Sequence, residues 1–267
     1  MRALLVLLAA CLSGPALGLR LATTTSVYDA GLLDRLLPAF ERAAGVRVEV
    51  LAVGTGQALR LAERKDVDAV LVHAPELEGE ALKRGVLAEP FCLAQNSYLL
   101  VGPKGDPARV REARDALEAL RRIARAQAPF VSRGDRSGTH LQELSLWAKA
   151  GLVPKGGWYL ESGAGMGQTL VLAAEKGAYT LSDLATHLTV GRKRGLVALH
   201  GRDDPLLLNQ YTYHVVPQGV RLKEAEALRR FLATEEAARL VGGLRVEGVQ
   251  LFKPLRGRCI IPWSGGL

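Results

Sequence analysis

The chain of 267 residues has few of the residues that build metal centres or disulfide frameworks. It contains only 3 cysteines, 5 histidines and 2 methionines. No Cys/His spacing resembles that of a zinc site or another metal site. Beyond the first residues, no apolar run is long enough to span a membrane. We therefore expect neither a bound metal nor a membrane-spanning helix.

The composition is that of a globular protein. Hydrophobic residues make up 48% of the chain and charged residues 23%, which does not fit a disordered chain. The formal net charge of +8 suits an anionic partner. Arginines are spread along predicted helical faces rather than gathered in one block, so a solvated surface explains them and no nucleic acid is implied.

The N-terminus has the pattern of a secretory signal. Met1-Arg2 is a short basic start, residues 3–12 are apolar, and residues 16–18 form a small-x-small cleavage site. We predict a signal peptide over residues 1–18 and a periplasmic or secreted protein. The alternative is lipoprotein anchoring through Cys11, although cleavage there would leave a signal of only ten residues.

Export bears on the other two cysteines, Cys92 and Cys259. An even pair in a disulfide-permissive compartment suits a bridge that would tie the C-terminal tail to the body. Two separate buried thiols fit the sequence equally well. The sequence leaves both interpretations open.

The first part of the chain alternates predicted strands and helices. Short apolar strands are predicted over 19–23, 46–53 and 66–72, and each is followed by a turn of small or polar residues and then by a helical pattern. This alternation is typical of a parallel sheet with crossover helices. The first helix carries its apolar residues at helical spacing: Leu32, Leu33, Leu36, Leu37 and Phe40.

A second α/β set lies between two β-rich runs, Ser97–Val101 and Tyr211–Val216. It includes a predicted helix over 113–126, and a last helix is predicted over 223–240. The simplest architecture is an α/β fold of two lobes, in which two crossing strands form the hinge. We predict that residues 19–96 and 211–267 form the first lobe and that the inserted residues 97–210 form the second.

The central stretch Ser132–His140 joins a predicted strand to a predicted helix and is rich in hydrogen-bond donors. Arg133 offers a fork of N–H groups, and the hydroxyls of Ser137 and Thr139 lie beside the small Gly138. A helix N-terminus adds free N–H groups and the positive end of a dipole. The same residues also suit an ordinary helix cap. Taken alone, the loop predicts a cap and an anion site about equally.

Three other loops share the features of this strand-to-helix loop. Each follows a predicted strand, opens a helix, and carries hydroxyls or glycines without a pair of carboxylates. If all four lie at the same edge of two lobes, they can surround a small anion with neutral donors and one guanidinium. The three loops are 23–26, 54–56 and 163–169.

Catalytic interpretations find less support. The glycine-rich run ends in Gly167-Gln168-Thr169 and so lacks the Gly-Lys-Ser/Thr ending of a P-loop. No nucleophile-elbow sequence surrounds Ser137 or His140. We expect a binding protein and not an enzyme. The alternative from another class is a phosphoryl- or acyl-transfer enzyme that uses the glycine-rich loop.

Taken in order, the motifs resemble the tungstate-binding component of ABC importers, over about residues 21–252. That family implies a periplasmic-binding-protein type II fold, a monomer without cofactor, and delivery of tungstate to an ABC permease and ATPase. Molybdate, sulfate or phosphate are the alternative ligands. The matching segments are 23–26, 31–34, 52–56, 66–75, 131–140, 156–161, 165–167 and 175–181.

A wider similarity to phosphate-binding proteins of the same fold implies roles for individual residues. Arg133 would hold the anion's charge and Asp135 would orient Arg133. Hydroxyls and N–H groups of both lobes would donate to the oxygens. The implied donors are Thr24, Thr25, Ser26, Thr55, Ser137, Gly138 and Thr139, with backbone N–H groups of Gly165 and Met166.

His73 marks a difference from the phosphate-binding proteins, which carry at the corresponding position an Asp that accepts the ligand's proton. A deprotonated tungstate or molybdate has no proton to give, so it needs donors only, and a carboxylate facing it would repel it. His73 either donates to the ligand or packs at the end of its strand. The sequence does not decide between these.

We expect His73→Asp to weaken tungstate binding more than His73→Asn, because only the former adds a negative charge. Calorimetric titration of both variants measures the difference. Equal losses of affinity would contradict the interpretation.

Overall fold

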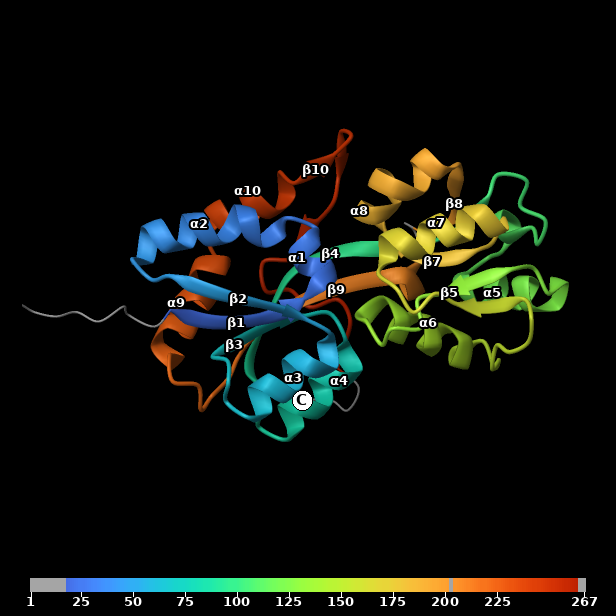
Figure 1. Cartoon of the computed structure of the whole chain (residues 1–267). Coiled ribbons are helices and arrows are strands. Elements are labelled where there is room, and N and C mark those ends of the chain that lie inside the picture. Colours follow the sequence, from blue (N-terminus) through green and yellow to red (C-terminus); the bar gives the residue numbers. More distant parts are fainter. Residues whose placement is uncertain (1–17, 202–203, 264–267) are drawn as a thin grey trace, which may run out of the picture.

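The computed structural model describes residues 18–201 and 204–263, which form two α/β halves joined by two long strands (Figure 1). Apart from Gly18, the predicted signal peptide lies outside the described residues, and so does Cys11. Among the helices that the structure describes, none is long and apolar enough to cross a membrane.

The first half is built on three parallel strands in the order β2-β1-β3. Because neighbouring strands run in one direction, their carboxyl ends meet at the same edge. The five apolar residues predicted to line the first long helix are all buried, as expected. The elements are β1 Leu19–Thr24, α1 Thr25–Asp29, α2 Leu32–Ala44, β2 Val48–Val53, α3 Thr55–Glu63, β3 Ala69–Val72 and α4 Pro75–Lys83.

Two antiparallel strands connect the halves. β4 (Ala88–Pro103) pairs with β9 (Leu208–Val215) as far as the pair Ser97 and Leu208, and its later part pairs with β7 (Thr180–Asp183) and β8 (Leu196–His200). β9 also pairs with β3 in the first half. The two crossing strands predicted from β-rich runs are therefore present, and both are longer than those runs.

The second half also brings parallel strand ends together. β5 pairs with β6, and Phe130 bridges in parallel to Tyr179, the residue before β7. The helix predicted from residue 113 begins three residues later, because Asp115 accepts the N–H of Glu118 and so caps it. The remaining elements are η1 Val110–Glu112, α5 Ala116–Ala126, β5 Phe130–Ser132, α6 Gly138–Lys149, β6 Tyr159–Glu161, α7 Met166–Lys176, α8 Leu184–Thr186, η2 His187–Gly191, η3 Arg192–Arg194 and η4 Pro205–Leu207.

The chain then returns to the first half. The single helix predicted over 223–240 is two helices, because the Thr234 side chain accepts the N–H of Ala237 and starts a new one. These helices cover the first sheet beside α2 (Figure 1). The last elements are α9 Leu222–Leu232, α10 Glu235–Gly242, β10 Arg245–Val246, β11 Val249–Gln250 and β12 Lys253–Pro254.

The C-terminal tail is fastened to both crossing strands. Cys92 of β4 forms a disulfide with Cys259, so the bridge is present and the alternative of two separate thiols is wrong. Gln210 of β9 accepts the N–H groups of Ile260 and Ile261. The tail thus holds the two strands together at the first half.

Removing this bridge is expected to destabilise the fold. It joins residues separated by 167 positions, and a cross-link of this kind stabilises by about 2–4 kcal/mol. We expect the Cys92→Ala/Cys259→Ala protein to lose about 2–4 kcal/mol of unfolding free energy in urea titrations. The unchanged protein treated with a reductant serves as control and should show a similar loss. An unchanged midpoint in both would contradict a stabilising role.

Candidate functional site

Polar groups line the carboxyl edge of the first sheet. Thr24 caps α1, and its hydroxyl accepts a hydrogen bond from an N–H of the first turn. Thr25 and Ser26 form that turn, so their own N–H groups have no partner within the helix. Thr55 opens α3 beside them, since Thr24 lies opposite Val53 in the sheet. The side chain of Thr25 is exposed, whereas Thr24 and Thr55 are buried.

The central loop of the second half is a helix cap that also holds a guanidinium. Ser137 caps α6, and its hydroxyl accepts the N–H of His140 at 3.3 Å. The carboxylate of Asp135 accepts the N–H of Ser137 and an N–H of the buried Arg133. Although burial opposes the shift, the hydrogen bond from Ser137 and the charge of Arg133 lower the pKa of Asp135. Asp135 therefore stays ionised and fixes the direction of Arg133.

A buried carboxylate braces α6 from behind. Glu143 accepts hydrogen bonds from Trp147 Nε1 at 3.1 Å and Tyr159 Oη at 2.7 Å. Burial raises the pKa of Glu143. Since Tyr159 belongs to β6, these bonds fix the helix against the small β5-β6 sheet.

The start of α7 is joined to the same loop. The Ser162 hydroxyl donates to the carbonyl of Arg133 at 3.2 Å and bonds to Thr169 Oγ1 at 2.8 Å. Gly165 is the N-cap of α7, and Met166 is its first residue. The first N–H groups of α6 and α7 thus belong to one hydrogen-bonded unit.

The two halves touch where Gly138 meets His73. A methyl group built on Gly138 would lie only 2.4 Å from His73 Cε1, so no larger residue fits there without displacement. Next to this contact lies a cavity of about 10 Å³, which is the space of about one water molecule. Its walls come from both halves: Ser26, Ala30, His73, Asn96, Tyr98, Thr139, Asp183, Ala185, Asn209 and Tyr211.

Five buried side-chain polar atoms at these edges have no hydrogen-bond partner among the described residues: Ser132 Oγ, His140 Nε2 and, from the predicted ligand-binding residues, Thr55 Oγ1, Arg133 Nε and Thr139 Oγ1. Such atoms are rare in folded proteins, because a buried polar group without a partner costs about 1–3 kcal/mol. They occur here beside helix N-termini that also present free N–H groups. The site therefore suits a ligand that brings hydrogen-bond acceptors and negative charge.

Seven residues of the cavity wall were not predicted from the sequence, and four of these are Asn or Tyr: Asn96, Tyr98, Asn209 and Tyr211. They come from the crossing strands, where residues two apart share one face. The register places Asn96 opposite Asn209, and Asn209 Nδ2 donates to Asn96 Oδ1 at 3.1 Å and to Tyr211 Oη at 2.7 Å. The repeat Asn-x-Tyr in both crossing strands was the available signal, although Asn96 and Asn209 lie just before the β-rich runs that were predicted.

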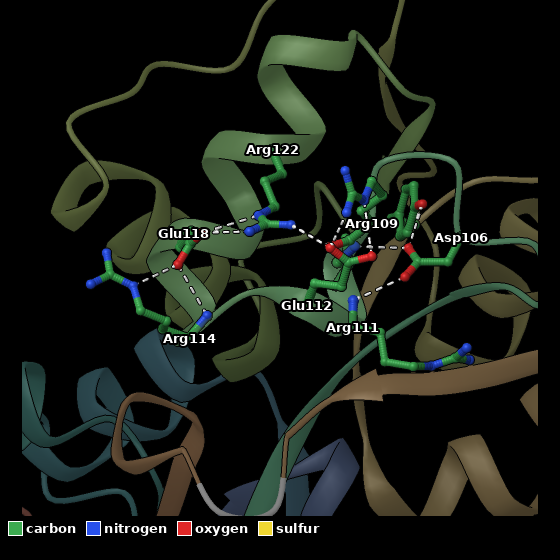
Figure 2. A network of polar contacts seen from close by, with 9 residues as sticks. Asp106, Arg109, Arg111, Glu112, Arg114, Glu118 and Arg122 are labelled. Atoms are coloured by element: carbon green, nitrogen blue, oxygen red, sulfur yellow. Dashed lines mark hydrogen bonds and ion pairs between the residues drawn. The ribbon is translucent and has the colours of Figure 1, made fainter.

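A second cluster of charged residues lies around η1 and α5, and several of its arginines are paired with carboxylates (Figure 2). Glu118 accepts hydrogen bonds from Arg122 and Arg114, and these lower the pKa of Glu118 to about 2. Arg109 is paired with Glu112. The guanidinium groups of Arg109, Arg114 and Arg122 have carboxylate partners at the protein surface, so this is an ion-paired surface.

A larger hollow of about 720 Å³ lies beside β8 and is lined mainly by aliphatic side chains such as Leu99, Leu184 and Leu188. None of the predicted ligand-binding residues lines it. Metal-binding groups are also lacking: within the described parts of the chain, no three His, Cys, Asp or Glu side chains come together.

Comparison with known proteins agrees with this geometry. Residues 12–235 match the model of the PBP superfamily domain. The chain is 38% identical to the tungstate-binding protein TupA of Peptoclostridium acidaminophilum, over 88% of this chain and 84% of that protein. It is 41% identical to a putative ABC transporter anion-binding protein of Haloferax volcanii, over 88% and 71% of the two chains.

Solved structures show the same relationship. TupA from Desulfovibrio alaskensis superposes with a TM-score of 0.79 at 37% identity, covering 90% of this chain and 99% of that one. The structure of a tungstate ABC transporter protein from Geobacter sulfurreducens gives a TM-score of 0.74 at 43% identity, covering 84% and 97%.

The Gly138–His73 contact predicts that Gly138→Ala separates the two halves. The added methyl cannot occupy its position 2.4 Å from His73 Cε1, so α6 and β3 must move apart. Small-angle scattering should show a larger radius of gyration than that of the unchanged protein. Gly105→Ala is the matched control, because nothing lies within 4 Å of its new methyl. An unchanged radius in the Gly138 variant would contradict the contact.

Proposed function

The chain belongs to the family of tungstate-binding receptors of ABC importers, and we propose on that premise that it captures tungstate between its two halves. The observation that carries the proposal is the set of buried donors without protein acceptors, Thr55 Oγ1, Arg133 Nε and Thr139 Oγ1. A fully deprotonated oxyanion offers only hydrogen-bond acceptors, and an acceptor is the partner that these donor atoms lack. The receptor would work in the periplasm and deliver the anion to an ABC permease driven by its ATPase.

Charge and hydrogen bonds together make such a site feasible. A dianion leaves water only if its charge is opposed and its oxygens are bonded. Arg133 supplies the full positive charge, and the N-termini of α3, α6 and α7 add dipoles. The proposed ligand-binding residues are Thr24, Thr25, Ser26, Thr55, Arg133, Ser137, Gly138, Thr139, Gly165 and Met166, with Asp135 and His73 behind them.

Binding would be coupled to closure of the two lobes. We take residues 19–96 with 211–267 and residues 97–210 as the moving bodies, with bending in β4 and β9. An anion that contacts both bodies favours the closed state, because only there are all its bonds made. The permease would then recognise the closed, monomeric receptor, and no cofactor is required.

A catalytic role gains no support from the geometry around Ser137. Its hydroxyl accepts the backbone N–H of His140 and does not contact the ring, while His140 Nδ1 accepts the N–H of Arg136 at 2.9 Å. His140 is thus not placed to activate that hydroxyl as a base. We therefore propose a receptor without enzymatic activity. Molybdate, which shares the charge and shape of tungstate, is the nearest alternative ligand, followed by sulfate and phosphate.

Arg133→Ala tests the proposal most directly. The substitution removes the one full positive charge of the proposed site, so tungstate affinity should fall by at least about 100-fold. Arg133→Lys should restore only part of it, because an ammonium lacks the planar fork. Calorimetric titration with tungstate, molybdate, sulfate and phosphate measures these changes.

Arg136→Gln is the matched control for this experiment, since Arg136 lies in the same loop but is exposed. Its affinity should equal that of the unchanged protein. The proposal fails if phosphate binds best, or if no oxyanion binds more tightly than about micromolar. Turnover of a phosphate ester would favour the enzymatic alternative.

A further inference from the structure

His73 is the one histidine placed between the two halves. Its ring is buried, with Nε2 at 3.2 Å from Ser26 Oγ and Nδ1 at 3.0 Å from both Asn209 Oδ1 and Tyr98 Oη. Its edge faces Gly138 at the start of α6. The residue therefore contacts a proposed ligand-binding hydroxyl on one side and both crossing strands on the other.

The hydrogen bonds around Asn209 decide which ring nitrogen of His73 carries the proton. Asn209 Nδ2 donates to Asn96 and Tyr211, so its Oδ1 faces His73 and must accept. His73 Nδ1 is then the donor, and Nε2 of the neutral ring is the acceptor. Ser26 Oγ also lies 3.1 Å from Thr24 Oγ1. With Thr24 as the donor of that bond, the Ser26 hydroxyl donates to His73 Nε2, and its proton is not available to a ligand.

The neighbours of His73 keep it neutral in the described state. Burial lowers its pKa, and Arg133 acts in the same direction. Glu78 of α4 and Asp183 at the end of β7 oppose this. The tyrosines at its faces, Tyr98 and Tyr211, are themselves neutral, since burial raises the pKa of each.

A bound dianion changes this balance. Arg133 already has Asp135 as a partner, and Asp183 also lines the cavity, so a dianion would add two negative charges to a buried site that has no surplus of positive charge. A nearby negative charge raises the pKa of a histidine. His73 is the basic group in contact with both edges of the proposed site, and its Nε2 already faces Ser26.

We propose that capture of an oxyanion dianion causes His73 to take up one proton from solvent. Protonated His73 then donates Nε2–H to Ser26 Oγ, and the Ser26 hydroxyl is released to donate to the anion. The proton adds positive charge and frees one donor in a single step. This inference rests on the proposed function, because it concerns the same site.

The number of protons taken up can be measured by calorimetry. We expect tungstate titrated near about pH 7.5, in buffers of different ionisation enthalpy, to draw up to one proton per anion from the buffer. His73→Asn should still bind tungstate, more weakly, with an uptake near zero. His140→Asn is the matched control, because His140 is also buried near Arg133, and its uptake should persist.

The same coupling predicts a pH dependence. Because binding raises the pKa of His73, affinity should weaken as pH rises, by up to about tenfold per unit between the pKa values of the free and bound states. His73→Asn should remove this slope. Ring NMR signals of His73 in the unchanged protein, recorded with and without tungstate, report the same change if the variant does not fold.

The outcomes separate the two proposals. Tight tungstate binding with a buffer-independent enthalpy would overturn the role of His73 and leave the receptor function intact. Loss of uptake in His140→Asn, with uptake retained in His73→Asn, would also overturn it. Failure of every oxyanion to bind would instead refute the proposed function.

Discussion

A small dianion can leave water only if its oxygens keep hydrogen bonds and its charge is opposed, and this constraint explains most of the architecture. No single loop of the chain has enough donors. Each sheet brings several strand ends to one edge, and the crossing strands β4 and β9 set the two edges against each other. In the proposed site Arg133 would supply the charge, and its pairing with Asp135 fixes its direction. In the proposed function, the two-lobed form would bring donors from several loops to one anion.

Helix capping and anion binding use different groups of the same turn. In α6 the Ser137 hydroxyl bonds the N–H of His140, which leaves the N–H groups of Gly138 and Thr139 free. In α1 the Thr24 hydroxyl accepts the N–H of Val27, and the N–H groups of Thr25 and Ser26 have no partner within the helix. The cap therefore fixes the turn while its first donors stay open. This is why capping chemistry and anion chemistry could not be told apart in the sequence of one loop.

What the sequence predicted well depends on neighbouring residues. The strand-to-helix loops, the helix cap within Ser132–His140 and the Arg133–Asp135 pair all involve residues within a few positions of each other. What it missed depends on pairing between distant segments. Asn209 became part of the cavity because the register places it opposite Asn96, 113 positions away. Glu143 could not be recognised as a brace without Tyr159. The sequence could not decide whether Cys92 and Cys259 form a bridge, because sequence spacing alone gives no distance between side chains.

The cavity wall contains one carboxylate, Asp183, whose oxygens accept the N–H and the hydroxyl of Thr186. The proposed ligand-binding groups are donors, whereas a protonated oxyanion must donate its own hydrogen to an acceptor. The site as proposed therefore favours anions that carry no proton. Neutral His73 is a partial exception, because Nε2 can accept a proton, but it faces Ser26 and not the ligand directly. In the proposed coupling, a proton on His73 Nε2 would strengthen the binding of a dianion. It would not help an anion that already carries a proton. The site would then distinguish protonated from deprotonated anions by hydrogen bonding. Closure of the lobes would have to distinguish dianions of similar size.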